Sequence, residues 1–333
     1  MARRWYGHLN EMNEETARPE ELPPLELNKL RDLSVDAPSS PGREAGITSA
    51  SGVVRRGDFV YVIGDDELHL GVFRLSSSEP GRLRQVLRGE LPDDHGERAQ
   101  AKPDLEALTV LPPFEENPYG ALLGLGSGSA PGRDRGFVCA LAADGSIAGD
   151  PHEVSHAPLY ELLREHVDDL NIEGAATMGD RLWLLHRGNA GGSSNMVAEL
   201  SLERLMRSLR EDLCLEAEEL QQVRRYDLGD LDGVKLCFSD ATPIADRLLV
   251  FTASAEADDG HIRGSVVGTL ELDGTVRRLR TIDRKWKVEG VHAAIDTGVL
   301  DLTFVCDQDD PEAPSPLLSA SMPLDGKLEF VKG

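Results

Sequence analysis

One pattern recurs five times along this chain of 333 residues. Each copy begins with a serine or a glutamate, which Gly or Ala follows in most copies. A short strand-like run, a turn with Gly or Asp, and an apolar run come next. The copies lie roughly 50 to 67 residues apart and begin at Ser51, Glu106, Glu173, Ser239 and Glu289. Repeats of this length that hold about four strands each are typical of a β-propeller, so five copies predict five blades.

The runs between the turns have the composition of strands. "DFVYVIGD" (58–65), "RLLVFTAS" (247–254) and "LDLTFVCD" (300–307) are rich in Val, Leu, Phe and Thr and are bounded by Gly, Asp or Pro. The predicted fold class is therefore all-β, with residues 25–333 forming a single five-bladed β-propeller domain. Residues 1–24 are polar, acidic and proline-ended, which predicts a flexible N-terminal arm.

A propeller avoids open sheet edges by joining its first and last strands. We expect residues 25–36 to supply a strand to the blade that begins at Glu289, which would bring the two ends of the chain together. Two segments depart from the all-β pattern, because "APLYELLREHVDDL" (157–170) and "LSLERLMRSLREDLCLEAEELQQV" (200–223) place leucines at helical spacing. They predict two amphipathic helices inserted between blades.

The net charge of −24 restricts the partners of this chain. It argues against nucleic acid and against an anionic membrane surface, because both would be repelled, and it is compatible with binding cations. The sequence has no apolar leader-like segment and no run of about 18 apolar residues, so neither a signal peptide nor a membrane span is expected. The four cysteines are scattered without zinc-like spacing, which favours buried thiols and a cytoplasmic location.

The five residues that begin the repeats should converge on one axis, because the first strand of each propeller blade lines the central channel. Three carboxylates in one narrow space would repel one another and raise each other's pKa. A divalent cation would offset this repulsion, and a set of oxygen ligands suits Ca²⁺ first and Mg²⁺ second, whereas Zn²⁺ prefers nitrogen or sulfur. We therefore expect a metal ring formed by Ser51, Glu106, Glu173, Ser239 and Glu289.

A second interpretation needs no metal. Each of these acids could accept backbone hydrogen bonds from a neighbouring blade, stay protonated, or be bridged by water. For a single glutamate this interpretation is the simpler one, and the metal hypothesis depends on all five residues lying in register.

The loops after the second strand of each blade should gather at one end of the ring. They carry acids and an arginine that could serve catalysis, namely Asp65, Asp66 and Arg187, of which the acids could assist proton transfer. They also carry a Gly- and Ser-rich loop with basic residues, which could cradle a small anion such as phosphate. The predicted ligand-binding residues are Ser127, Ser129, Arg133, Arg135 and Asn189. The same Gly- and Ser-rich loop could equally be a hairpin turn, and His186 and His292 are expected to be structural.

The order Ser, Glu, Glu, Ser, Glu resembles that of the soluble calcium-activated nucleotidases (apyrases), which are five-bladed propellers. "SGVVRRGDFVYVIGDD", "EGAATMGDRLWLLHRGN" and "KWKVEGVHAA" are similar to strings of that family. The resemblance implies a calcium ion held on the axis by the five repeat-initiating residues and places Arg187 on the family's arginine. The turn "GDDELHLG" lacks the arginine that the family has there. At another position, where the family has a lysine, this chain has Thr or Ala. Both differences count against nucleotide hydrolysis. The "EG" strings also resemble phytase-like propellers and a group of bacterial propellers of unknown function.

Two functional classes follow. The first is a binding protein that holds a central divalent cation and a small anionic ligand at the rim. The second is a metal-dependent hydrolase that acts on phosphate esters, anhydrides or lactones. Propellers host both classes, so the fold does not choose between them. Arginines that converge with acids on a metal-bound water would favour the hydrolase, and arginines committed to salt bridges between blades would favour the binding protein.

Overall fold

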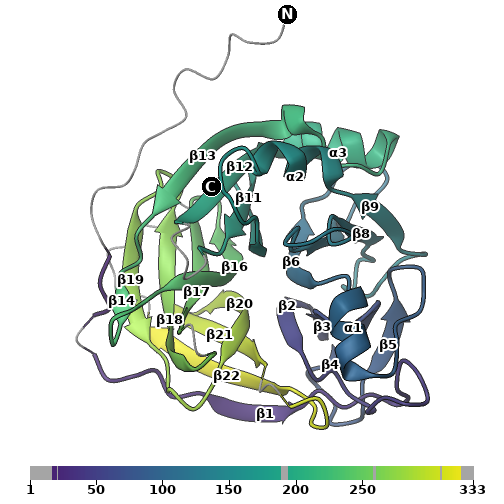
Figure 1. Cartoon of the computed structure of the whole chain (residues 1–333), viewed down its shortest axis with the longest axis horizontal. Coiled ribbons are helices and arrows are strands. Elements are labelled where there is room, and N and C mark those ends of the chain that lie inside the picture. Colours follow the sequence, from purple (N-terminus) through teal and green to yellow (C-terminus); the bar gives the residue numbers. More distant parts are fainter. Residues whose placement is uncertain (1–16, 21, 189–193, 258–259, 308–309, 324–333) are drawn as a thin grey trace, which may run out of the picture.

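The computed structural model describes residues 17–20, 22–188, 194–257, 260–307 and 310–323. Five four-stranded antiparallel sheets surround a common axis like the blades of a propeller (Figure 1). The predicted fold class is confirmed. The described residues contain no helix long and apolar enough to cross a lipid bilayer.

The strands of each blade follow one another from the axis outward. Blade 1 contains β2 (Ala50–Arg56), β3 (Phe59–Gly64), β4 (His69–Arg74) and β5 (Arg82–Gln85). Blade 2 contains β6 (Leu105–Leu111), β7 (Ala121–Gly126), β8 (Arg135–Ala140) and β9 (His152–Ser155). Blade 3 contains β10 (Ile172–Met178), β11 (Arg181–His186), β12 (Asn195–Ser201) and β13 (Leu220–Tyr226). Blade 4 contains β16 (Cys237–Ala245), β17 (Leu248–Glu256), β18 (Ile262–Glu271) and β19 (Val276–Thr281).

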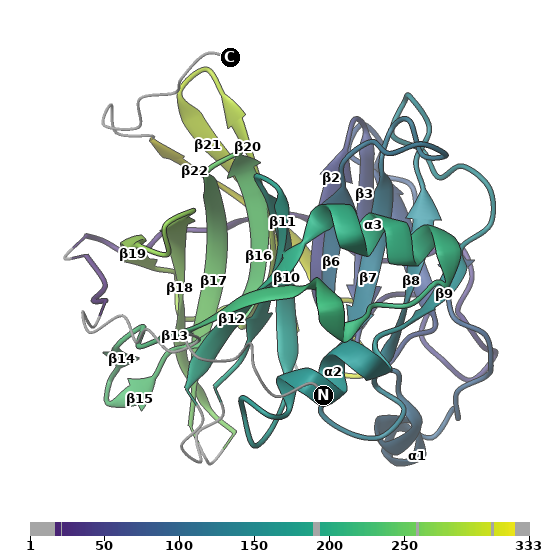
Figure 2. The same cartoon turned by 90° about the horizontal axis from the view of Figure 1, so that it is seen from above.

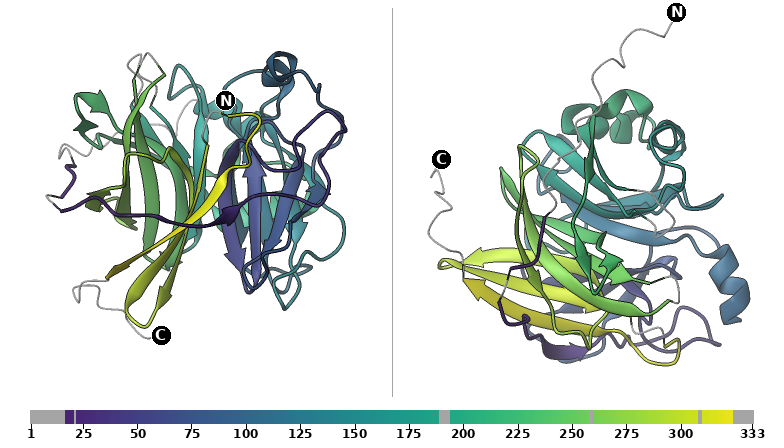
Figure 3. Two further views of the ribbon diagram at one scale, coloured as in Figure 1. Left: turned by 90° about the horizontal axis from the view of Figure 1, so that it is seen from below. Right: turned by 60° about the vertical axis from the view of Figure 1, so that its left-hand side comes forward.

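Blade 5 joins the two ends of the chain. Its strands are β20 (Val288–Asp296), β21 (Val299–Cys306), β22 (Pro316–Pro323) and β1 (Asn28–Asp32). β1 pairs antiparallel with β22, and Figure 3 shows the purple N-terminal strand beside the yellow C-terminal one. The expected ring closure is therefore confirmed. Of the predicted N-terminal arm, residues 1–16 and 21 lie outside the described residues, whereas Ala17 and Glu20 donate backbone hydrogen bonds to Asp227 and Leu279.

The core lies between the blades. Both faces of the second strands are buried, which explains why "FVYVIG" and "ALLGLG" are continuous apolar runs. Five apolar clusters each join two neighbouring blades; Trp183 of blade 3 packs with Phe251 of blade 4 in one, and Val62 of blade 1 with Val305 of blade 5 in another. Burying such a side chain contributes about 1.5–3 kcal/mol, so blade contacts hold the ring together.

The helices differ from the expectation in length and number. α2 (Ala157–Leu163) and α3 (Leu202–Glu211) lie within the two predicted segments. The helix predicted over 200–223 is wrong beyond Glu211, because Leu213 has a positive φ of 49° and the chain from Leu220 forms β13. A third helix, α1 (His95–Ala101), and the small hairpin of β14 (Asp230–Leu231) and β15 (Val234–Lys235) were not expected. α1 lacks an apolar stripe, and its buried side chain is Arg98.

A candidate cation site at one end of the axis

The five repeat-initiating residues occupy the same structural position in all five blades. In every inner strand the pairing with the second strand shifts by one residue, and the residue left out of the pairing is Ser51, Glu106, Glu173, Ser239 or Glu289. Such a β-bulge bends the strand and re-aims one side chain. The five bulges lie where the inner strands begin, at the end of the axis that also holds α1 and α2 (Figure 2). We call it the carboxylate end, after Glu106, Glu173 and Glu289.

The small residue after each glutamate is explained by the packing of the inner strands. A Cβ atom on Gly174 would lie 2.9 Å from the backbone of Asp240 and Ala241 in the next blade. A Cβ on Gly290 would lie 2.7 Å from the carbonyl oxygen of Ser51. Because backbone cannot give way as a flexible side chain can, these positions exclude larger residues. The "EG" strings therefore mark the closest approaches between blades.

Burial and mutual repulsion both act on the three glutamates. Glu173 and Glu289 are buried, and Glu106 is half-buried. Burial raises the pKa of Glu106 well above its usual range, and the charges of Glu173, Asp65 and Asp104 raise it further. Burial also raises the pKa of Glu173, and it raises the pKa of Glu289 to about 7. These three carboxyl groups therefore keep their protons to higher pH than an exposed glutamate does.

The protein supplies some of the opposing charge itself. Arg187, which follows β11, lies 3.8 Å from Glu173 and pairs with Glu256 at the end of β17. Lys287 lies 3.5 Å from both Glu289 and Asp307. Among the described residues, Glu106, Glu173 and Glu289 do not form one close group of ligand oxygens, and Glu173 and Glu289 each lie beside a cationic side chain. The metal ring of five residues stays a prediction.

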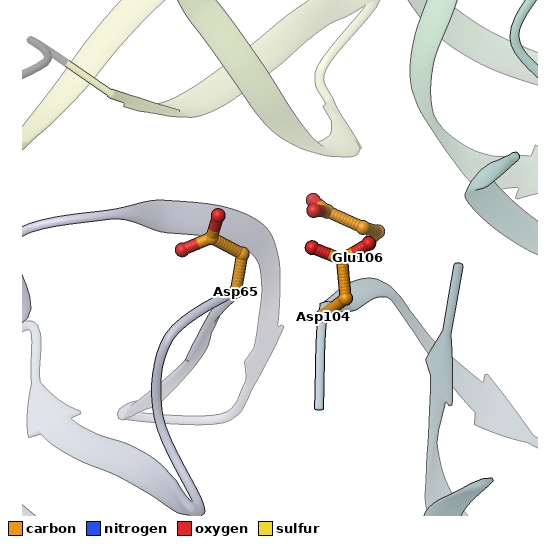
Figure 4. A group of neighbouring side chains, drawn as sticks. All are labelled: Asp65, Asp104 and Glu106. Carbon is orange, nitrogen blue, oxygen red and sulfur yellow. The ribbon is translucent and has the colours of Figure 1, made fainter. Parts of the chain in front are cut away.

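A tighter group of carboxylates lies between blades 1 and 2. Asp65, Asp104 and Glu106 each offer one oxygen, and these oxygens lie within 4.8 Å of one another (Figure 4). No other group of three His, Cys, Asp or Glu side chains this close occurs among the residues that the structure describes. Lys102 contacts Asp65 and lies 2.6 Å from Asp104. One oxygen of Asp65, Oδ1, is buried and accepts no hydrogen bond from a described residue.

Three of the predicted anion-binding residues converge on a carboxylate instead. Ser127 and Ser129 donate hydrogen bonds to Asp104, the latter at 3.0 Å. Arg133 lies 2.8 Å from the same carboxylate and 2.9 Å from Ser129. These contacts, with Lys102, outweigh burial and lower the pKa of Asp104. An anion at this loop would meet Asp104 in the centre of its cradle.

The other predicted rim residues have different surroundings. Asp66 is buried and bonded to Ser49 at 2.6 Å, Arg98 at 2.7 Å and Arg43 at 3.1 Å, so its carboxylate anchors α1 to blade 1. Arg135 reaches the carbonyl oxygen of Arg88 at 3.4 Å. Asn189 lies outside the described residues.

The two serines of the ring make contacts with their own surroundings. Ser51 donates to the carbonyl oxygen of Ser49 at 3.4 Å, and Ser239 donates to Ser254 at 3.2 Å. His186 is buried, and its Nδ1 accepts the backbone N–H of Asn171 at 3.0 Å. Burial lowers the pKa of His186 to about 4, so it stays neutral, as its expected structural role requires.

Sequence reasoning missed Asp104, Lys102 and Asp240. Asp240 is fully buried and accepts the backbone N–H groups of Ala241 at 2.7 Å and Val291 at 2.8 Å, which joins blade 4 to blade 5. It follows Ser239 in the sequence, in the place where three other repeats have Gly. Asp104 stands two residues before Glu106 in "KPDLEAL", but it precedes β6 and has a positive φ of 57°, so strand alternation did not point to it.

The sequence comparisons show the family. A model of a family of unknown function, DUF6929, matches residues 46–322, which is most of the chain. The chain belongs to the DUF6929 family. No curated protein matches its sequence. The matching family model thus covers blades 1 to 4 and the three C-terminal strands of blade 5, without β1. The resemblance to calcium-activated nucleotidases and phytase-like propellers stays a hypothesis.

Solved structures of similar shape include several enzymes that act on carbohydrates. An α-L-arabinofuranosidase from Podospora anserina, solved with cellotriose, has a TM-score of 0.50 and 12% identity, over 90% of this chain and 98% of that one. A GH130 hydrolase described as targeting β-1,2 mannosidic linkages in Candida mannan has a TM-score of 0.46 and 10% identity, over 93% and 99%. A glycosyl hydrolase from Bacteroides ovatus has a TM-score of 0.42 and 8% identity, over 93% and 99%. At such low identity the first likeness supports the propeller fold alone.

Proposed function

We propose that this DUF6929 protein binds one divalent cation, Ca²⁺ first and Mg²⁺ second, at the carboxylate end of its axis. The observation that carries it is the repeated bulge, which places an oxygen-bearing residue of every blade at the same end of the axis. Glu106 belongs both to this ring and to the close group with Asp65 and Asp104. We therefore place the cation at Glu106.

The charge balance supports the proposal. Seven carboxylates meet four cationic side chains in the ion pairs and close groups of this end, a formal excess of three negative charges; the acids are Asp65, Asp104, Glu106, Glu173, Glu256, Glu289 and Asp307, and the bases are Lys102, Arg133, Arg187 and Lys287. Without an ion, protonation relieves part of this excess, because the pKa values of Glu106, Glu173 and Glu289 are raised, and a divalent cation would take the place of these protons. The donors are oxygens only, which suits a hard cation whose remaining positions are filled by water.

The geometry favours binding over hydrolysis. Arg187 joins Glu173 of blade 3 to Glu256 of blade 4, and Asp66 is held by two arginines, so neither is free to act on a substrate. The small anionic ligand expected at the rim would have to displace Asp104 from Ser129 and Arg133. Hydrolysis of a phosphate ester, anhydride or lactone remains the alternative, with Asp65 as its acid through Oδ1, the oxygen that accepts no hydrogen bond from a described residue. Turnover of a panel of such compounds with Ca²⁺ would support it.

Thermal unfolding with Ca²⁺, Mg²⁺ or chelator tests the proposal. A cation that binds only the folded protein contributes about 2.7 kcal/mol at one hundred times its Kd, which for a chain of this length raises Tm by about 4 °C. Glu106→Gln should reduce this rise, whereas Glu161→Gln, an exposed glutamate on α2, should keep it. Elemental analysis of the purified protein would identify the ion. An identical Tm in Ca²⁺, Mg²⁺ and chelator would reject cation binding.

A further inference from the structure

The ammonium of Lys102 lies beside the close group of carboxylates, where a bound cation would also lie. Its ammonium contacts Asp65 and lies 2.6 Å from Oδ1 of Asp104. These are two of the three acids whose oxygens approach within 4.8 Å of one another. A divalent cation at this group would therefore meet a positive charge that is already present, and two cations at such short range repel each other strongly.

The backbone of Lys102 is fixed, while its side chain has freedom to move. Lys102 ends α1, and its N–H donates to the carbonyl oxygen of Arg98 at 2.8 Å. Arg98 in turn is buried against Asp66, which fastens the helix to blade 1. The lysine side chain is 19% exposed and has four rotatable methylene groups, so its ammonium can move without any change in the helix.

A pocket beside the group can receive the displaced ammonium. It has a volume of about 280 Å³ and lies between blades 1 and 5 and α1. Lys102 and Asp65 form part of its wall, and Asp307 and Asp310 form another part. An ammonium that left Asp104 could therefore stay close to carboxylates. Asp65 Oδ1, buried and without a hydrogen-bond donor among the described residues, is the oxygen best placed for an added cation.

We propose that Lys102 is a tethered counter-cation, which competes with the divalent cation for Asp65, Asp104 and Glu106 and swings toward Asp307 and Asp310 when that ion binds. This inference rests on the proposed cation binding and adds its regulation. Lys102 neutralises the acids when no ion is bound, and it thereby sets the affinity of the site. The protein would bind only when the free ion concentration is high enough to displace the lysine.

Calorimetric titration of Ca²⁺ into the wild type and three variants tests the competition. Lys102→Met keeps the length of the side chain and removes its charge, so it should bind Ca²⁺ at least tenfold more tightly than the wild type. Lys102→Arg, which keeps the charge, and Lys285→Met, at an exposed lysine paired with Asp283, should stay within about threefold of the wild type.

The outcomes separate the two proposals. If the wild type binds and Lys102→Met binds no more tightly, the role of Lys102 is wrong and cation binding stands. If only Lys102→Met binds, cation binding by the natural protein is rejected, and with it the release of Lys102 by the ion. If neither binds, both proposals are rejected.

A measurement on the wild type covers the case in which Lys102→Met does not fold. Acetylation by acetic anhydride needs an accessible amine, and the contacts with Asp65 and Asp104 shield the amine of Lys102 while no ion is bound. Ca²⁺ should increase the acetylation of Lys102, read by peptide mass spectrometry, at least threefold relative to Lys285. Equal or lower labelling of Lys102 with Ca²⁺ would overturn the proposal.

Discussion

Glu106 is the residue whose pKa is affected most by opposing influences. Burial and three neighbouring acids disfavour its charge, and Lys102 is the base that opposes them. A buried acid with this environment lowers the stability of the folded protein whenever it is ionised. Residues that lower the free energy of unfolding and have no structural role are typical of functional sites. Asp240, which is fully buried, differs because its two backbone hydrogen bonds give it a clear structural role.

Replacing Glu106 by glutamine should stabilise the protein when no divalent cation is present. In chelator at pH 8 we expect Glu106→Gln to raise the free energy of unfolding by about 1–2 kcal/mol, because it removes a repelled charge and keeps the shape. The change is measured by urea unfolding. In saturating Ca²⁺ the order should reverse, with the wild type more stable. Glu161→Gln is the matched control, and a Glu106→Gln protein less stable than wild type in chelator would contradict the argument.

β1 is the element that turns five blades into a closed ring. Its pairing with β22 covers the outer edge of blade 5. Leu33, which follows β1, is fully buried; its N–H donates to Ser315, and its carbonyl oxygen accepts from Ile47. Leu30, three residues earlier within β1, is 51% exposed. Two leucines three residues apart thus differ in burial, Leu33 being buried and Leu30 exposed.

The two leucines make a matched pair for testing the closure. Leu33→Ala should lower the free energy of unfolding by about 2–4 kcal/mol, since it leaves a cavity in the cluster shared by blades 1 and 5. Leu30→Ala should change it by less than about 0.5 kcal/mol. Both values come from denaturant unfolding followed by fluorescence and circular dichroism. Equal effects of the two changes would mean that Leu33 does not hold the closure.

Across the whole molecule, buried acids and buried histidines make opposite contributions to stability as pH changes. Burial lowers the pKa of His156 to about 3 and of His292 to about 4. A histidine of lowered folded-state pKa adds stability as pH rises toward its unfolded pKa, and this gain is complete above about pH 6.5. Burial raises the pKa of Glu289 and Glu219 to about 7. An acid whose pKa is raised in the folded state has the opposite effect. The free energy of unfolding falls as pH rises from the unfolded to the folded pKa, because the unfolded state releases its proton first.

Stability in chelator should therefore fall between pH 6.5 and 8. Glu289 and Glu219 account for a loss of about 1 kcal/mol each in this window, and Glu106 and Asp240, with pKa raised well above the usual range, add to it. Calorimetric Tm values at several pH values measure the loss, which should be smaller in saturating Ca²⁺. A Tm that rises from pH 6.5 to 8 in chelator would show that the acids are not held in this way.

The repeat pattern was sufficient to predict the propeller, its closure and the five bulge residues. Each repeat carries its own turn residues and alternation, so its register can be read from a few neighbouring positions such as Glu173 and Gly174. Comparable local signals located α2 and α3. They did not locate their ends, because β13 forms only by pairing with β12 in the assembled blade.

Tertiary structure alone decided which charges meet. Asp104 contacts Ser129 and Arg133 of the loop between β7 and β8, and Arg187 contacts Glu256 in the next blade. Such pairings depend on how loops from different blades lie against one another, and no spacing in the chain encodes them. Local chemistry therefore placed the acids at one end of the axis, while the three-dimensional packing determined how their charge is shared between lysines, arginines and the proposed cation.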